Sequence, residues 1–292
     1  MKYFKKIYLE ITNICNLNCT FCSKSKRPPL FMDMELFRTI LTKLEGHTKH
    51  LYFHVLGEPL LHPKLGEIIQ ESHEKGYQVN ITTNGTLLQE SIYEKLLTEG
   101  LRQINISLHS WKDNNQFNRP QEFDKYLEQI IKFIEQAKLV KPGLFINLRL
   151  WNLKASKDLE ENNGYVLKKL SQALALDFTI SPEQLLAGNS ITLRKNLFLS
   201  SDVEFIWPSL DAQYIGNTGY CYGLKNQLAI LVDGSVIPCC LDGEGTIILG
   251  NIKDSSLQEI IDSPRAQAIY QGFANRKVIE PLCQRCNFRT RF

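Results

Sequence analysis

The chain lacks any apolar run close to the roughly 20 residues that a membrane-spanning helix needs. Its first residues contain lysines and only the short apolar stretch Ile7-Tyr8-Leu9, which Glu10 follows at once. A secretory signal needs a longer apolar region, so the N-terminal sequence does not indicate export. We therefore expect a cytoplasmic protein with no membrane partner.

The chain also has little net charge. Its 34 lysines and arginines and 31 aspartates and glutamates leave a net charge of +3 over 292 residues. This balance gives no reason to expect nucleic acid or an acidic surface as a partner. The hydrophobic content of 43% is enough for a sizeable core, and no long linker rich in proline, glycine and serine interrupts it. We expect two domains, residues 1–200 and residues 201–292.

Cysteine is absent from residues 23–220, which divides the eight cysteines into two groups. A disulfide framework does not suit a chain without an export signal. Scattered core cysteines would not gather at spacings of three or four residues. Both groups therefore predict metal sites. The first group is Cys15, Cys19 and Cys22, and the second is Cys221, Cys239, Cys240, Cys283 and Cys286.

Strand-like and helix-like patterns alternate through the first half of the chain. The predicted strands are 6–11, 50–55, 78–82, 103–108 and 144–150, and the predicted helices are 33–45, 63–75, 91–99, 121–139 and 165–174. Such alternation predicts a parallel sheet with chemistry on the loops after the carboxyl ends of strands. It does not distinguish an open sheet from a barrel. Further on, weaker patterns predict strands at 177–180 and 191–193, a hairpin at 228–237 and a short helix at 256–263.

The first cysteine group follows a predicted strand with the spacing Cys15-x-x-x-Cys19-x-x-Cys22. Three thiolates can hold a four-iron cluster and leave one iron open, whereas a structural zinc site normally uses four protein ligands. Later strands are followed by Leu56-Gly57-Glu58-Pro59, Thr83-Asn84-Gly85 and Ile106-Ser107-Leu108. Over residues 6–180 this pattern resembles the radical S-adenosylmethionine (SAM) superfamily.

The resemblance implies an α/β fold, a partial (β/α)6 TIM-like barrel followed by a small C-terminal α+β iron–sulfur domain. It also implies that the three cysteines ligate a [4Fe–4S] cluster and that SAM binds the open iron. In this family one electron breaks a carbon–sulfur bond of SAM, and the resulting 5′-deoxyadenosyl radical removes a hydrogen atom from the substrate. A reducing partner such as flavodoxin or ferredoxin would supply that electron.

The resemblance also implies which residues touch SAM. Phe21 stands where the family carries an aromatic residue beside the adenine, and Glu58 would accept hydrogen bonds from the SAM ammonium group. Gly57 would permit a close backbone approach. This chain has Leu56 where the family often has the first glycine of the motif, which weakens a backbone contact at that position.

Further candidates have equally plain structural alternatives, such as capping, turn formation or a surface position. Candidates for contact with the SAM ribose or carboxylate, or with a substrate anion, are Asn84, Ser107, Arg119 and Arg149. His54 and His109 are candidates for substrate binding or proton transfer, although we favour a structural role for both.

The second cysteine group offers four thiolates in Cys221, Cys239, Cys283 and Cys286. This chemistry alone also suits a zinc ribbon. The segments 234–239, 249–252 and 283–286 resemble the SPASM/twitch extensions of radical SAM enzymes, which implies one auxiliary [4Fe–4S] cluster. We favour Cys239 over Cys240 as the ligand, because it follows the proline of the motif and adjacent residues of an extended segment point in opposite directions.

The leading hypothesis is a radical SAM oxidoreductase or maturase that modifies or oxidises a peptide or protein side chain. Because the first predicted strand begins near the N-terminus, we expect no separate peptide-recognition domain, which weakens this hypothesis without excluding it. One alternative is a small-molecule alcohol dehydrogenase of the twitch type. Others are a nucleic-acid-modifying enzyme and a non-catalytic iron–sulfur or zinc-binding protein.

Overall fold

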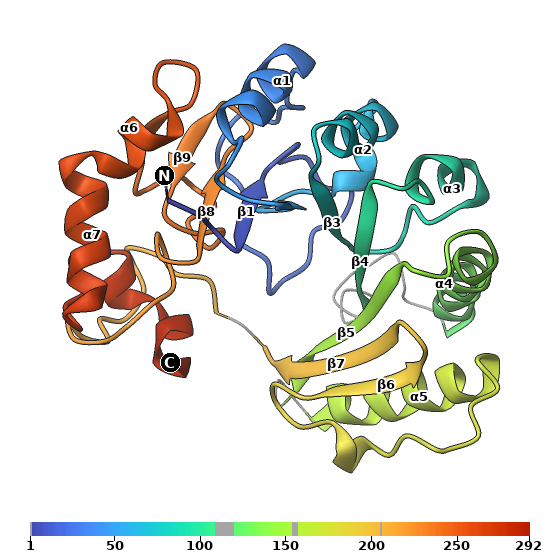
Figure 1. The fold of residues 1–292 in the computed structure, drawn as a ribbon. Coiled ribbons are helices and arrows are strands. Elements are labelled where there is room, and N and C mark those ends of the chain that lie inside the picture. Colours follow the sequence, from blue (N-terminus) through green and yellow to red (C-terminus); the bar gives the residue numbers. More distant parts are fainter. Residues whose placement is uncertain (1, 109–119, 154–156, 205) are drawn as a thin grey trace. The chain divides into compact units, whose positions relative to one another are not determined.

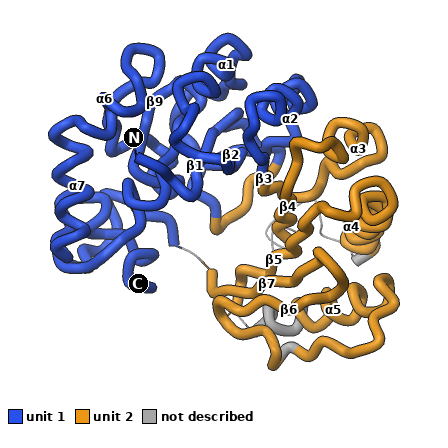
Figure 2. The backbone as a smooth tube through the Cα atoms, viewed as in Figure 1, with its two compact units in different colours: residues 1–16, 22–80, 206–292 blue, residues 17–21, 81–205 orange. Residues whose placement is uncertain are grey.

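The computed structural model describes residues 2–108, 120–153, 157–204 and 206–292. Internal contacts divide the chain into two compact units (Figure 2). Unit 1 comprises residues 1–16, 22–80 and 206–292, and unit 2 comprises residues 17–21 and 81–205. The domains expected from the sequence, 1–200 and 201–292, remain a prediction, because compactness and functional division are different properties.

Unit 1 is built on a mixed sheet with the strand order β10-β9-β8-β1-β2 (Figure 1). Its strands are β1 (Lys6–Leu9), β2 (His50–Phe53), β8 (Gln227–Ile230), β9 (Ser235–Ile237) and β10 (Gly250–Asn251). β1 pairs in parallel with both β2 and β8, while β9 is antiparallel to β8 and to β10. A segment near the C-terminus therefore extends the sheet that the N-terminal strand begins.

The helices of unit 1 agree with the sequence prediction in part. They are α1 (Met34–Lys43), η1 (Pro59–Leu61), α2 (Leu65–Glu74), α6 (Leu257–Asp262), α7 (Pro264–Ala274), η5 (Cys283–Arg285) and η6 (Asn287–Arg291). The predicted N-cap Asp33 is confirmed, since its carboxylate accepts the N–H groups of Glu35 and Leu36. α1 buries Phe37 against Phe53 of β2, with ring centroids 6.2 Å apart.

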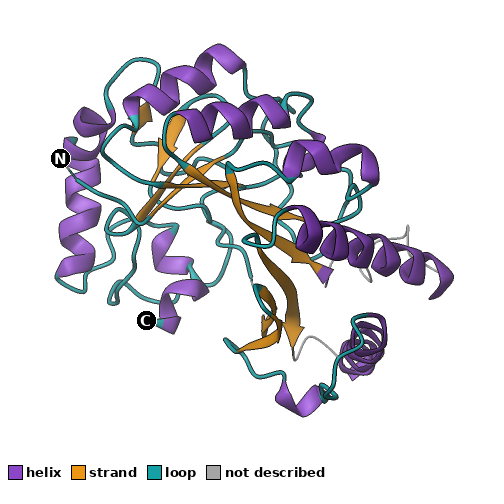
Figure 3. Ribbon diagram, turned by 45° about the vertical axis from the view of Figure 1, so that its right-hand side comes forward, coloured by secondary structure: helices purple, strands orange, loops and turns teal. Residues whose placement is uncertain are grey.

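Unit 2 contains a second set of parallel strands, β4 (Leu101–Ser107), β5 (Phe145–Leu153) and β7 (Leu197–Val203), with β6 (Ser190–Arg194) antiparallel to β7. Its helices are α3 (Glu90–Leu96), α4 (Pro120–Val140), α5 (Lys157–Ala173) and η4 (Pro182–Gln184), and the long helix α4 runs beside the strands (Figure 3). The chain passes between units within β3 (Gln78–Thr83). Strands that alternate with helices and pair in parallel confirm the predicted α/β fold class.

The face alternation of β5 decides which side chains are available for a site. Ile146, Leu148 and Leu150 are buried, whereas Asn147 and Arg149, between them, are only half-buried. Successive strand side chains point to opposite faces, so the polar residues share the face away from the apolar core.

Several element predictions need correction. No strand forms at 177–180, where the chain makes bends and Phe178 is exposed. α5 begins at Lys157 rather than near 165, because its first turns are polar and give no apolar periodicity. β7 and α7 were not predicted, since Ser200 and Ser201 interrupt one pattern and Gly272 the other. In the described part of the chain, no helix is long and apolar enough to cross a membrane.

Candidate metal and cofactor sites

The first cysteine group lies on a loop that leaves β1 and is closed at its base. Thr12 Oγ1 donates to the carbonyl oxygen of Leu30 at 2.8 Å. Asn13 Nδ2 donates to the Pro28 carbonyl oxygen at 2.8 Å, and Asn13 Oδ1 accepts the Leu30 N–H at 2.8 Å. These side-chain bonds fix both ends of the loop in unit 1.

The three thiols of this loop differ in exposure. Cys15 is exposed, Cys19 is buried and Cys22 is half-buried. Cys15 and Cys22 belong to unit 1, while Cys19 and the half-buried Phe21 belong to unit 2. Three thiols on one short loop match the donor set of a cluster that keeps one iron open. The adenine contact predicted for Phe21 remains a prediction.

The Gly57-Glu58 motif rests directly on the start of the cysteine loop. Gly57 has a φ of +79°, and a Cβ there would collide with the carbonyl oxygen of Thr12 and the backbone of Asn13. The Glu58 N–H donates to the Ile14 carbonyl oxygen at 2.8 Å. Only glycine fits at position 57, since both the conformation and the space exclude a side chain.

The Glu58 carboxylate is 1% exposed, and one of its oxygens accepts the Leu60 N–H at 3.0 Å to cap η1. It is thus held by its own loop at the end of β2, beside the residue that precedes Cys15. Leu56, which replaces the family's first glycine, is buried and packs against Gly243. That position therefore contributes packing with the C-terminal segment, a contact that no short motif predicts.

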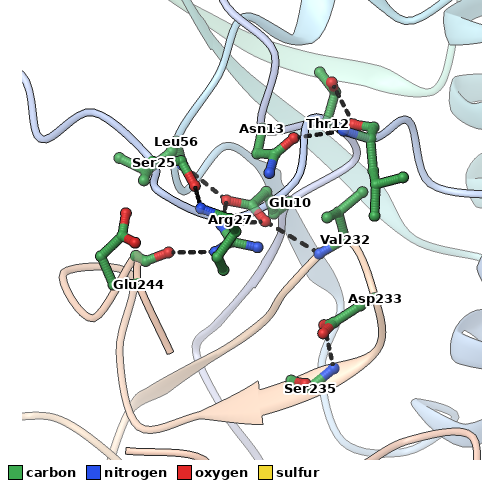
Figure 4. A network of polar contacts seen from close by, with 12 residues as sticks. Glu10, Thr12, Asn13, Ser25, Arg27, Leu56, Val232, Asp233, Ser235 and Glu244 are labelled. Atoms are coloured by element: carbon green, nitrogen blue, oxygen red, sulfur yellow. Dashed lines mark hydrogen bonds and ion pairs between the residues drawn. The ribbon is translucent and has the colours of Figure 1, made fainter. Parts of the chain in front are cut away.

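A buried ion pair joins the cysteine loop to the C-terminal segment of unit 1 (Figure 4). Glu10 is 0% exposed, and Arg27 Nη2 donates to its two carboxylate oxygens at 2.6 and 2.8 Å. The Val232 N–H donates to Glu10 at 3.1 Å, and Arg27 Nε donates to the Gly243 carbonyl oxygen at 3.0 Å. Burial raises the pKa of Glu10, and the hydrogen bond and charge of Arg27 oppose that rise.

In unit 2, three polar side chains lie in one row across the sheet. The register pairs Ser107 of β4 with Arg149 of β5, and Arg149 with Ser200 of β7. The Arg149 guanidinium stacks on Trp151 at 4.4 Å from the ring centroid. The structure thus brings together two of the predicted residues, Ser107 and Arg149. Their contact with SAM remains a prediction.

The remaining candidate ligand residues of unit 2 do not belong to this row of polar side chains. The Asn84 side-chain oxygen accepts the Thr86 N–H at 2.9 Å, which forms a turn after β3. Tyr126 donates its hydroxyl to the Asn84 carbonyl oxygen at 2.7 Å, so the turn is anchored to α4. This turn matches the structural alternative for Asn84, whose ligand role remains a prediction. Arg119 and His109 lie outside the described residues.

Sequence reasoning did not find two polar residues that extend the row. Asn147 lies two residues before Arg149 in β5 and is paired with Asn105 of β4. Its Nδ2 donates to Asn105 Oδ1 at 3.4 Å. The buried oxygens Asn147 Oδ1 and Ser200 Oγ accept or donate no hydrogen bond within the described residues. For Asn147 the signal was the alternation of the polar residues Asn147 and Arg149 with apolar residues in β5. Buried polar atoms need partners, so this face suits a polar ligand.

The second cysteine group gathers within unit 1. Burial raises the pKa of Cys239 first, and the neighbouring thiols of Cys221, Cys240 and Cys283 raise it further. Burial and then the Cys221 and Cys286 thiols raise the pKa of Cys283 in the same way. The Gly223 N–H points at Cys221 Sγ, 3.5 Å away. Four crowded thiols resist ionisation unless a cation binds them, which is the chemistry of a metal site.

These four thiols are not drawn together as ligands of a single ion. Within the described ranges, no three His, Cys, Asp or Glu side chains form a group that would hold one metal ion. A tetrahedral zinc site with Zn–S bonds of about 2.3 Å brings its sulfurs to about 4 Å from one another. A four-iron cluster binds each thiolate on a different iron and needs a wider set.

Cys240 has different surroundings. It packs against the apolar group that contains Tyr8, Ala229 and Ile237. Burial raises the pKa of Cys240 to about 11, and a hydrogen bond with Tyr8 opposes the rise. His54 meets the ring of Tyr8 edge-on, with centroids 5.1 Å apart. The structure thus joins His54 and Cys240 through Tyr8, a cluster that the sequence did not indicate.

Comparison with known proteins agrees with this geometry. The family model "Radical SAM superfamily" matches residues 9–147, and the model "Iron-sulfur cluster-binding domain" (SPASM) matches residues 221–287. The chain is 25% identical to the tungsten-containing aldehyde ferredoxin oxidoreductase cofactor-modifying protein of Pyrococcus furiosus, over 99% of this chain and 88% of that protein.

Two solved structures resemble the whole fold. BtrN in complex with AdoMet and 2-DOIA has a TM-score of 0.60 and 19% identity, covering 98% of this chain and 94% of that chain. Native anSMEcpe with bound AdoMet and the Kp18Cys peptide has a TM-score of 0.59 and 15% identity, covering 97% and 86%. The chain is an enzyme of the radical SAM superfamily, with a partial-barrel α/β fold, a C-terminal SPASM-type domain, SAM as cofactor and an auxiliary cluster in addition to the SAM-binding one.

Proposed function

We propose that this enzyme removes a hydrogen atom from its substrate and completes a net oxidation or modification. The proposed ligands of the SAM-binding cluster are Cys15, Cys19 and Cys22, and those of the auxiliary cluster are Cys221, Cys239, Cys283 and Cys286. When bound, the first cluster and SAM supply the electron and the 5′-deoxyadenosyl radical for hydrogen removal. The auxiliary cluster offers a one-electron acceptor.

The protein's own residues orient the cofactor and exclude water from it. The Glu58 carboxylate, fixed by the Leu60 N–H, would accept hydrogen bonds from the SAM ammonium group. Gly57, which has no side chain, lets the backbone approach the start of the cysteine loop closely. Ser107 and Arg149 offer a hydroxyl and a guanidinium to the ribose and carboxylate, and Phe21 offers its ring to the adenine.

The contrast between the two cysteine groups supports this proposal. The first has three thiols on an open loop, one of them exposed. The second has four partly buried thiols that perturb one another's pKa values. An open group suits the binding of an external ligand, and a closed group suits electron transfer. A non-catalytic metal protein would not need an incomplete set of ligands beside the buried carboxylate of Glu58.

We favour a peptide or protein side chain as the substrate. Support comes from the fold similarity to structures solved with peptides, anSMEcpe with Kp18Cys and SuiB with SuiA. A small organic alcohol is the second candidate, because the similarity to BtrN with 2-DOIA extends over 94% of that chain. In both cases flavodoxin or ferredoxin is the proposed electron donor, and residues 1–200 and 201–292 are the proposed functional domains.

The test is an anaerobic assay of iron content and SAM cleavage. We expect about eight irons per chain and formation of 5′-deoxyadenosine after reduction and addition of SAM. About four irons plus one zinc would contradict the auxiliary cluster. No 5′-deoxyadenosine from fully loaded protein, with peptide pools and with small alcohols, would contradict the proposed activity.

The same assay distinguishes the substrate classes when the substrate is deuterated. Transfer of deuterium into 5′-deoxyadenosine from a peptide supports the first candidate, and transfer from a small alcohol supports the second. Glu58→Gln tests the proposed SAM contact, and we expect weaker SAM binding with unchanged iron content. Glu67→Gln, on the exposed surface of α2, is the matched control.

A further inference from the structure

Arg289 is a charged residue buried beside the second cysteine group. It lies in η6, is 5% exposed, and donates to three backbone carbonyl oxygens. Nε reaches Cys283 at 2.9 Å, Nη1 reaches Thr218 at 2.7 Å, and Nη2 reaches Gly216 at 2.6 Å. One guanidinium thus connects the segments that precede Cys221 and contain Cys283.

The charge of Arg289 has no carboxylate partner within the described part of the chain. No ion pair involves it there, and its acceptors are neutral carbonyls. Burying a charge is costly unless an opposite charge lies nearby. Arg289 Nε donates to the carbonyl oxygen of Cys283, a proposed cluster ligand, so the charge lies beside the second cysteine group.

The backbone around Arg289 is shaped to accommodate the guanidinium. Gly219 has a φ of +150°, and a Cβ there would approach Arg289 Nη1 to 2.5 Å. Gly216, whose carbonyl accepts from Nη2, also has a positive φ, of +144°. Positive φ and missing side chains at both positions are permitted by glycine. The site is therefore built around the cation.

The carboxylates near the cysteine group are already occupied. Glu280 accepts two hydrogen bonds from Arg265, at 2.8 and 2.9 Å. Asp242 accepts the N–H groups of Thr246 and Ile247, at 2.8 and 2.7 Å. Both carboxylates are negative, so neither can balance negative charge on the sulfurs. Among the described residues, Arg289 is a buried cation beside this group that no carboxylate neutralises.

We propose that Arg289 is the counter-charge of the auxiliary cluster, and that it raises the cluster's reduction potential while fixing the ligand segments. The inference depends on the proposed ligand set. A [4Fe–4S] cluster with four thiolates is an anion that becomes more negative on reduction, so a buried cation favours the reduced form. Arg289 acts through the cluster and is therefore a positioning residue. Its effect is to make the auxiliary cluster a better electron acceptor.

The test is an anaerobic redox titration of the loaded, full-length protein followed by electron paramagnetic resonance. Addition of SAM identifies the signal of the SAM-binding cluster, since only that signal responds. For Arg289→Gln we expect the ratio of reduced to oxidised auxiliary cluster at a fixed potential to fall about tenfold. For a one-electron couple this is a shift of about 59 mV to lower potential.

Two further variants separate charge from structure. Arg289→Lys keeps the charge but loses the planar fork, and we expect a ratio within about twofold of wild type. Arg291→Gln removes an equal charge from an exposed position in the same helix, where water screens it, and we expect no shift. Loaded Arg289→Gln with an unchanged potential would overturn the proposal.

The conservative variant decides the case in which Arg289→Gln does not retain its auxiliary iron. A loaded Arg289→Lys protein with a wild-type potential then supports the counter-charge. A tenfold change in that variant, or failure to load, overturns it in favour of a geometric role. Failure of the proposed function looks different, because wild-type protein would then lack the second iron–sulfur signal altogether.

Discussion

The two cysteine groups of this enzyme differ in how completely the protein surrounds them. The first is on a loop closed only at its base by Thr12 and Asn13, and Cys15 is exposed. The four proposed ligands of the second are all half-buried, and Arg289 donates to the carbonyl oxygens of Cys283, Thr218 and Gly216. The same ligand atom is thus presented in an open and in a closed environment.

The difference shows how one chain can assign two tasks to one type of metal group. A cluster that binds an external molecule needs an accessible iron, which an incomplete and exposed ligand set permits. A cluster that accepts an electron benefits from fixed ligands, low solvent access and a tuned local charge. Variants that remove a ligand of either cysteine group, or the ion pair between the cysteine loop and the C-terminal segment, test whether the two clusters have separate roles.

The largest effect is expected from removing a ligand of the open group. Cys22→Ser should lose about four irons per chain and abolish 5′-deoxyadenosine formation. Iron analysis and product quantification provide the measurement. Cys240→Ser is the control, because Cys240 packs against Tyr8 and is not a proposed ligand. Equal iron loss in the control would contradict the ligand assignment.

Removing a ligand of the closed group should have a different outcome. Cys286→Ser should also lose about four irons, while SAM cleavage continues without substrate oxidation. The ratio of oxidised substrate to 5′-deoxyadenosine measures this uncoupling. Complete loss of cleavage in a folded, partly loaded variant would mean that the two groups do not have separable roles.

The buried ion pair that joins the loop to the C-terminal segment is expected to matter mainly for stability. Arg27→Gln leaves Glu10 buried without its partner, so the free energy of unfolding should fall by about 3–5 kcal/mol. Chemical denaturation of loaded protein measures it. Arg38→Gln breaks an exposed pair with Glu71 that water screens, and it should leave the free energy of unfolding nearly unchanged. A similar loss in both variants would show that burial does not matter here.

The smallest effect concerns the pH dependence of stability near the closed group. Burial raises the pKa of Asp242 to about 6 from an ordinary value of 3.8. An acid whose pKa is higher in the folded state binds its proton there first, so its contribution to stability decreases as pH rises from about 4 to about 6. Relative to Asp242→Asn, wild-type protein should lose at most about 3 kcal/mol across this window. Parallel denaturation curves at pH 4, 5 and 6 for both proteins provide the check, and identical pH profiles would contradict it.

Local chemistry was predictable from the sequence, because it depends on residues that are neighbours in the chain. Asp33 caps α1 as expected, and Gly57 has the positive φ that its motif required. The cysteine spacings indicated iron–sulfur sites for the same reason, and the motifs around them indicated the family. These features need only residue type and short spacing.

Long-range partners were not predictable. Nothing in the sequence paired Glu10 with Arg27, placed Leu56 on Gly243, or brought Arg289 beside Cys221. These contacts depend on strand register and on the path of turns, which a single sequence does not encode in a local pattern. The row from Ser107 to Ser200 was also hidden, since β7 itself was missed.

The parallel pairing of β1 with β8 has a consequence for how the chain is made. Lys6 and Leu9 align with Gln227 and Ile230, so β1 keeps one unpaired edge until most of the chain has left the ribosome. Such a distant pairing delays completion of the sheet and leaves a strand edge open to other chains. The N-terminal ligands Cys15, Cys19 and Cys22 therefore leave the ribosome before β8, whereas Cys283 and Cys286 leave it afterwards.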